Sequence, residues 1–118
     1  MDPQFDGVIF QTHSAELHRR LHYPFPPFKI LDARSADEFR RGHLPGALLA
    51  SGQDLAAVLA QETGRIEIFV VGNLPGDPRV REVSLALLQL GAHRIVELTG
   101  GMLEWKRSGH EMDFERAA

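Results

Sequence analysis

Residues 66–72 read Ile-Glu-Ile-Phe-Val-Val-Gly, and this stretch is the strongest strand signal in the chain. Almost every residue in it is β-branched or aromatic, and its hydrophobicity does not alternate. A continuous apolar run is typical of a strand at the centre of a parallel sheet, where both faces are covered. We therefore expect a central strand that ends at Gly72, followed by a loop at residues 73–76.

The sequence after this loop predicts a helix, a strand and a second helix. Asp77-Pro78 is a strong helix start, because aspartate caps free backbone amides and proline suits the first helical turn. We expect a strand at 94–98, a turn at 99–101, a helix at 102–108 and a tail after Gly109. The first helix ends before Gly91 and has an apolar stripe of Val80, Val83, Leu87 and Leu90.

The sequence before the central strand predicts the same alternation. We expect a helix at 14–21, a proline-rich connector, a strand at 28–31 and a brief strand at 47–50. Ser35 and Glu38 have the spacing of a capping box, in a short helix that Gly42 ends. A further helix is expected between Asp54, as its cap, and Gly64.

Length and composition fit one domain. The chain has 118 residues, of which 43% are hydrophobic and 25% charged, with a net charge of −3. We expect a single domain over 1–118, with a helix and connector at 1–27, a core at 28–112 and a tail at 113–118. Alternating strands and helices predict an α/β fold with a central parallel sheet and helices on both faces.

Charge and hydropathy exclude several partners. Basic residues are scattered among acidic ones, so we expect no nucleic-acid surface. No window resembles a membrane span or a secretory leader, so we expect a cytoplasmic protein without a membrane partner. The sequence contains no cysteine, which excludes disulfides, zinc-thiolate sites, iron–sulfur clusters and thiolate nucleophiles.

Two motifs resemble those of a known family. Residues 31–39 read Leu-Asp-Ala-Arg-Ser-Ala-Asp-Glu-Phe, and residues 42–47 read Gly-His-Leu-Pro-Gly-Ala. Residues 98–105 read Leu-Thr-Gly-Gly-Met-Leu-Glu-Trp. Order and spacing resemble rhodanese-like (sulfurtransferase homology) domains from about Ile30 to Met112. The resemblance implies a three-layer α/β fold with about five parallel strands.

The resemblance also implies where chemistry would occur. In active rhodaneses the central strand ends in a cysteine that carries sulfane sulfur as a persulfide, and the loop amides surround that sulfur. Here the aligned residue is Gly72, and a one-residue shift would place Val71 there instead. Neither side chain is a nucleophile, so we expect no catalytic residue and no persulfide chemistry.

The remaining loop is the candidate site. We interpret it as a vestigial active-site loop or a small-anion site, because amides at a helix start attract anions. Asp77 argues against an anion, since an N-cap carboxylate would accept the same amides. The loop site comprises Gly72, Asn73, Leu74, Pro75, Gly76, Asp77 and Arg79. Its expected supporting residues are Asp32, Arg34 and His43, where an Asp32–Arg34 pair and a His43 hydrogen bond would brace neighbouring turns.

Three functions remain open from the sequence. The leading hypothesis is an inactive rhodanese-like domain that acts as a binding or regulatory module for a protein or a small anion. One alternative is a sulfurtransferase whose cysteine is replaced in this chain or supplied by a partner, and another is a structural or oligomerisation domain. Ser51, Thr99 and Asp77 are the conceivable substitute nucleophiles, but no Ser-His-Asp spacing singles one out.

Other chemically capable residues have ordinary explanations. His18 and His22 are four apart on a predicted helix, but with His13 they lack a third ligand of fixed geometry, so we predict no metal site and no cofactor. Trp105 is expected in the core with its indole N–H on a backbone carbonyl. The aromatic and proline stretch at 23–28 is either an exposed partner-binding surface or a strap packed across the domain.

Overall fold

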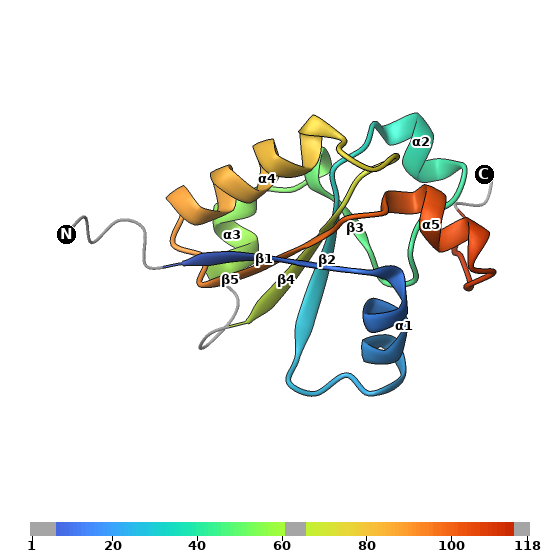
Figure 1. The fold of residues 1–118 in the computed structure, drawn as a ribbon. Coiled ribbons are helices and arrows are strands. Elements are labelled where there is room, and N and C mark those ends of the chain that lie inside the picture. The colour runs from blue at the N-terminus through green and yellow to red at the C-terminus, as the bar shows by residue number, and fades with distance from the viewer. Residues whose placement is uncertain (1–6, 61–65, 115–118) are drawn as a thin grey trace.

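The sheet has the predicted parallel arrangement. The computed structural model describes residues 7–60 and 66–114. Its five strands pair in the order β1-β5-β4-β2-β3, and every pairing is parallel (Figure 1). β4 is therefore central, as its sequence predicts. The strands are β1 (Val8–Thr12), β2 (Phe28–Asp32), β3 (Leu48–Leu49), β4 (Glu67–Val71) and β5 (Arg94–Leu98).

Helices cover both faces of this sheet and give three layers. Phe69 and Val71 of β4 belong to a core cluster that also contains residues of α1, α2 and α5. Ile68 and Val70 point to the other face, where they pack with residues of α3 and α4. All four side chains are buried, which explains why the strand sequence does not alternate. The helices are α1 (Ser14–His22), α2 (Ala36–Arg40), α3 (Leu55–Ala60), α4 (Pro78–Gln89) and α5 (Gly101–Arg107), with a 3-10 turn at Ala50–Gly52.

Local signals for the helix starts are confirmed. Ser35 and Glu38 form the complete capping box of α2, with Glu38 N donating to Ser35 Oγ and Ser35 N donating to the Glu38 carboxylate. Asp77 caps α4, and Pro78 occupies the first helical turn. The expected helix end at Gly64 lies outside the described residues. None of the described helices is long and apolar enough to cross a bilayer.

Three expectations need correction or refinement. The residue patterns missed β1, because it is an edge strand whose Val8 and Phe10 remain 51% and 40% exposed. Leu90 does not extend the apolar stripe of α4: the helix ends at Gln89, and Leu90 is 47% exposed. In the stretch 23–28, Phe25 is 83% exposed while Phe28 packs edge-on against Phe69, so only the end of that stretch is a strap.

The chain after Gly109 is not a free tail at its start. The indole N–H of buried Trp105 donates to the Glu111 carbonyl at 2.8 Å, as expected for a core tryptophan. Asp113 and His43 exchange two backbone hydrogen bonds of 2.9 Å in an antiparallel bridge. The segment after Gly109 is therefore fixed to the domain at two points, Glu111 and Asp113. Its sequence has no periodic pattern that would have indicated these contacts.

Candidate functional site

The predicted loop site begins where β4 ends. Gly72 is buried directly after the strand, and its carbonyl accepts a hydrogen bond of 2.9 Å from Met102 N. The Asn73 carbonyl accepts one of 3.0 Å from Leu103 N. Both donors belong to the first turn of α5, where backbone amides have no partner within the helix. The start of α5, which belongs to the second sequence motif, thus holds the loop in place through two backbone hydrogen bonds.

The Asp77 carboxylate is the anion of this loop. One oxygen accepts from Asn73 N at 2.9 Å and the other accepts from Arg79 N at 3.1 Å, so the carboxylate uses amides that a bound anion would need. The Arg79 guanidinium also donates to both oxygens, at 3.0 and 2.8 Å. These Arg79 bonds, with the two amides, lower the pKa of Asp77 to about 2 against the opposing effect of burial. Asp77 is therefore ionised at neutral pH.

Gly72 has no room for a side chain in this arrangement. A Cβ atom built there would lie 2.7 Å from Val80 Cγ2 and 2.8 Å from Asp77 Cβ. It would also lie 2.9 Å from a carboxylate oxygen of Asp77. Contacts this short require neighbours to move, and the oxygen carries a negative charge that disfavours a thiolate. Asp77 thus occupies the space in which a cysteine at position 72 would project.

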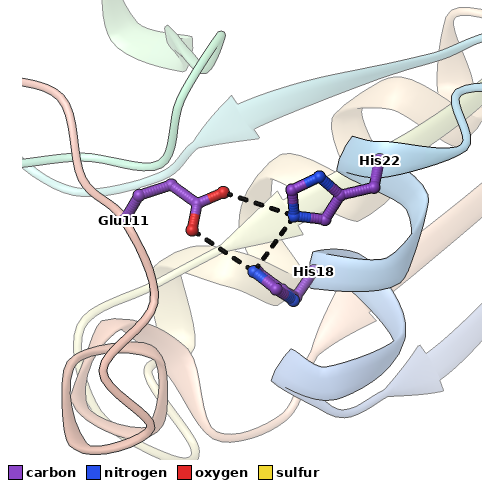
Figure 2. A group of neighbouring side chains, drawn as sticks. All are labelled: His18, His22 and Glu111. Carbon is purple, nitrogen blue, oxygen red and sulfur yellow. Dashed lines mark hydrogen bonds and ion pairs between the residues drawn. The ribbon is translucent and has the colours of Figure 1, made fainter.

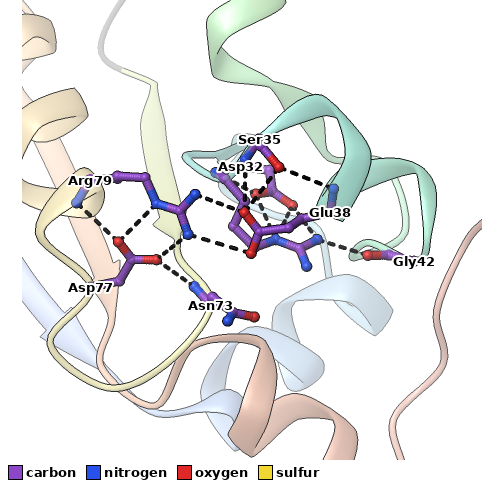
Figure 3. A network of polar contacts seen from close by, with 8 residues as sticks. Asp32, Ser35, Glu38, Gly42, Asn73, Asp77 and Arg79 are labelled. Atoms are coloured by element: carbon purple, nitrogen blue, oxygen red, sulfur yellow. Dashed lines mark hydrogen bonds and ion pairs between the residues drawn. The ribbon is translucent and has the colours of Figure 1, made fainter.

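Arg79 connects the loop to the first sequence motif. Its guanidinium donates to Glu38 at 2.8 Å as well as to Asp77, so one cation lies between two carboxylates (Figure 3). Arg79 lowers the pKa of Glu38 to about 2, burial opposes this, and the Ser35 hydrogen bonds add to it. The two carboxylates in turn raise the pKa of Arg79. The predicted positive charge is present, but it is already neutralised by this chain.

Asp32 lies beside this network (Figure 3), and Arg34 forms an ion pair with it. Both are buried, and the Arg34 guanidinium donates to Asp32 at 2.8 and 3.0 Å. Arg34 also donates to the Gly42 carbonyl at 2.7 Å, which ties the end of β2 to the turn after α2. A guanidinium held by a carboxylate through two hydrogen bonds suits a bracing role, which stays a prediction for this pair.

His43 also has a bracing geometry and lies apart from the loop. Its Nδ1 atom is 2.8 Å from the Phe39 carbonyl, and its ring stacks on the Phe39 ring at 3.8 Å. Its backbone forms the bridge to Asp113. The structure therefore brings Asp32 and Arg34 to the site and places His43 in the packing of α2.

The structure places the three conceivable substitute nucleophiles in different surroundings. Ser51 is exposed in the 3-10 turn, where it lines a hollow with Leu55 and Arg79. The Thr99 hydroxyl donates to the Thr12 carbonyl at 3.1 Å. Asp77 accepts hydrogen bonds from two backbone amides and from Arg79, so both of its carboxylate oxygens are already engaged.

Sequence reasoning missed one participant of this site, Glu38. Glu38 was already accounted for by the capping-box spacing. No sequence pattern indicated that its carboxylate also accepts a hydrogen bond from Arg79, which is 41 residues away. The excess of acidic over basic residues in the chain is only a weak indication that Arg79 would be neutralised. The pairing follows from the position of α2 next to the start of α4.

Comparisons with known proteins agree with this architecture. The sequence profile named rhodanese-like domain matches residues 14–108. A solution structure of the rhodanese-like domain of an Anabaena sp. protein is 27% identical, with a TM-score of 0.70, and the match covers 98% of this chain and 81% of that one. No curated protein sequence matches the chain.

Two further solved structures are similar in fold. A thiosulfate sulfurtransferase from Pseudomonas aeruginosa is 23% identical with a TM-score of 0.75, and the match covers 92% of this chain but 21% of that one. A Saccharomyces cerevisiae protein, described as a homolog of single-domain rhodanese and of the Cdc25 phosphatase catalytic domain, is 22% identical with a TM-score of 0.66. That match covers 91% of this chain and 86% of the yeast chain.

Proposed function

The chain belongs to the rhodanese-like domain family, and from this premise we propose that it is a non-catalytic member that acts as a binding or regulatory module. The observation that carries the proposal is the absence of any cysteine in the 118 residues. A persulfide needs a sulfur atom on the protein, and glycine at the strand end has no side chain to replace it. The fold is retained while the atom that receives the sulfur is missing.

The Asp77 carboxylate supports the same proposal independently. It accepts the amides of Asn73 and Arg79, which leaves those donors unavailable to a substrate anion or a developing negative charge. Removing an attacking atom from a covalent mechanism costs several orders of magnitude in rate, and the electrostatic remainder is also reduced here. The loop therefore lacks the nucleophile of a sulfur-transfer site, and Asp77 already occupies two of its amide donors.

A protein partner fits the loop better than a small anion. The two arginines placed beside the loop already pair with carboxylates, Arg79 with Asp77 and Glu38, and Arg81 with Glu97. Leu74 at the loop tip is 52% exposed, and a hollow lies beside it between the start of α4 and the end of β5. An exposed apolar tip next to a concave surface favours contact with another macromolecule.

The activity test is a thiosulfate-to-cyanide assay on the purified chain. We expect thiocyanate at the rate of the uncatalysed mixture, while an active rhodanese run in parallel gives a rapid signal. Turnover at an enzyme-like rate by this chain would contradict the proposal. Adding a cysteine-containing acceptor protein tests whether a partner supplies the thiol; stimulation that requires this chain would favour the sulfurtransferase alternative.

Titration with anions tests whether the loop binds a small anion rather than a protein partner. Thiosulfate and sulfate should give no saturable change in the backbone amide resonances of residues 72–79 in the unmodified chain. Asp77→Ala frees two amides and should create weak saturable binding at those resonances. Saturable binding by the unmodified chain would instead favour a small anion as the ligand.

A further inference from the structure

A second group of polar side chains lies away from the loop, between α1 and the segment after α5. His18 and His22 are four residues apart on α1, so their rings share one face of the helix. Glu111 extends toward them from the other segment, 93 residues away in sequence from His18 (Figure 2). The third ligand that the histidine spacing lacked is thus a carboxylate, and it does not come from His13.

The distances among the three groups match the edges of a metal coordination polyhedron. The two Nε2 atoms are 3.3 Å apart, and the carboxylate oxygens lie 3.2 Å from His18 Nε2 and 3.7 Å from His22 Nε2. Zinc bonds of about 2.0–2.2 Å at tetrahedral angles separate neighbouring ligand atoms by roughly 3.3–3.5 Å. The two carboxylate contacts use different oxygens, and with one ligand atom taken from each residue all three lie within 4.8 Å of one another. The three side chains are therefore close enough to bind one ion together.

Protons cannot satisfy all three contacts at the same time. An imidazole Nε2 has one position in the ring plane, which holds either a hydrogen or a lone pair. His18 Nε2 lies within hydrogen-bonding distance of both His22 Nε2 and Glu111, yet it makes only one directed hydrogen bond. A single cation among the three groups accepts one lone pair from each of them.

Two of the three ligands, His18 and Glu111, are held by packing or hydrogen bonding next to the buried Trp105. The His18 ring stacks on the His110 ring at 4.0 Å and contacts the edge of Trp105 at 5.9 Å. The indole N–H of Trp105 holds the Glu111 carbonyl at 2.8 Å, and the Asp113–His43 bridge fixes the chain just beyond it. His18 and Glu111 are thus positioned by the core, which reduces the entropy lost on binding an ion.

We propose that His18, His22 and Glu111 form a binding site for a divalent transition metal of the zinc class, with the remaining coordination position open to water. Imidazole and carboxylate ligands suit zinc and its cobalt substitute, and the chain offers no thiolate to select a softer ion. Glu111 and His22 are each more than half exposed on their side chains, so the open position faces solvent. The ion joins α1 to the segment after α5.

The test uses the untagged full chain, stripped of metal with a chelator and titrated with Co²⁺. We expect one equivalent to give the visible absorption of four-coordinate cobalt and to quench the fluorescence of Trp105, the single tryptophan, which lies against His18. Zn²⁺ should abolish the absorption, and calorimetry with Zn²⁺ should give the same stoichiometry. Absence of saturable binding to the folded chain would overturn the proposal.

Exposed ligands allow variants that keep the fold. Loss of an outer-shell partner of a metal site typically lowers affinity about 10- to 100-fold, so His22→Gln and Glu111→Gln should each lower it at least that much. His13→Gln is the matched control, because His13 is exposed next to α1 and makes no capping bond through its side chain. Unchanged affinity in Glu111→Gln, or a loss in His13→Gln as large as in His22→Gln, would overturn the assignment.

Discussion

The loop at residues 72–79 and the cluster of His18, His22 and Glu111 both contain several ionisable side chains. They differ in whether the hydrogen-bonding groups of these side chains all find partners within the chain. At the loop, Arg79 lies between Asp77 and Glu38, and donors and acceptors pair within the chain. In the cluster, two imidazoles and a carboxylate converge, and protons cannot satisfy all three of their contacts at once. The loop's charged groups are therefore satisfied within the chain, whereas the cluster is where we propose that a metal ion binds.

We expect the largest loss of unfolding free energy at the Asp32–Arg34 ion pair, because both side chains are buried. Asp32→Ala leaves the buried Arg34 guanidinium without its carboxylate, and losing one partner of such a pair costs about 3–5 kcal/mol. Urea denaturation should show this loss in the free energy of unfolding. Asp37→Ala is the control, because Asp37 pairs with Arg40 at the surface and should change little. Equal effects of the two variants would contradict the buried bracing role.

Restoring the family's thiol should strain the loop. Gly72→Cys forces atoms against Val80 and Asp77, and overpacking of this kind costs about 1–3 kcal/mol of unfolding free energy. Burial and the neighbouring Asp77 carboxylate should raise the pKa of the introduced thiol. Alkylation rates measured against pH give that pKa. Combining Gly72→Cys with Asp77→Ala should lower it, and a depressed thiol pKa in the single variant would show that Asp77 does not close the site.

Strong acid should destabilise the loop network, because it protonates the two carboxylates that pair with Arg79. The folded-state pKa values of Asp77 and Glu38 are about 2, below their ordinary values of 3.8 and 4.5. A depressed pKa adds stability that is complete above the ordinary value and is lost as pH falls toward the folded value. After solvent screening we expect a loss on the order of 1–2 kcal/mol. Urea midpoints at successive pH values should show it, and Arg79→Gln should flatten the profile.

We expect the smallest change in stability from a substitution in the histidine cluster when no metal is bound. Glu111→Gln removes an exposed carboxylate whose contacts with His18 and His22 lie at the surface, so the urea midpoint of the stripped protein should not change measurably. With saturating Zn²⁺ the unmodified chain should melt at a higher temperature than the variant, because ligand binding stabilises only the folded state. A large loss of stability without metal would mean that the cluster is a structural ion pair.

The fold was largely accessible from local sequence patterns. The central strand, the capping box at Ser35 and the Asp77-Pro78 helix start are confirmed, because each depends on residues close together in the chain. β1 was not found, since an edge strand with exposed side chains has a weak pattern. The bridge between His43 and Asp113 was also missed, because no periodicity marks a two-residue contact.

The sequence alone determined that this protein has no thiol and that Gly72 follows its central strand. The amino-acid composition shows the absence of cysteine, and the local apolar run at residues 66–71 shows where the strand ends. Only the tertiary structure decided that Asp77 fills the space beside Gly72, that Glu38 neutralises Arg79, and that Glu111 meets the histidines of α1. These pairings join residues on different elements, and sheet order and helix packing set their distances.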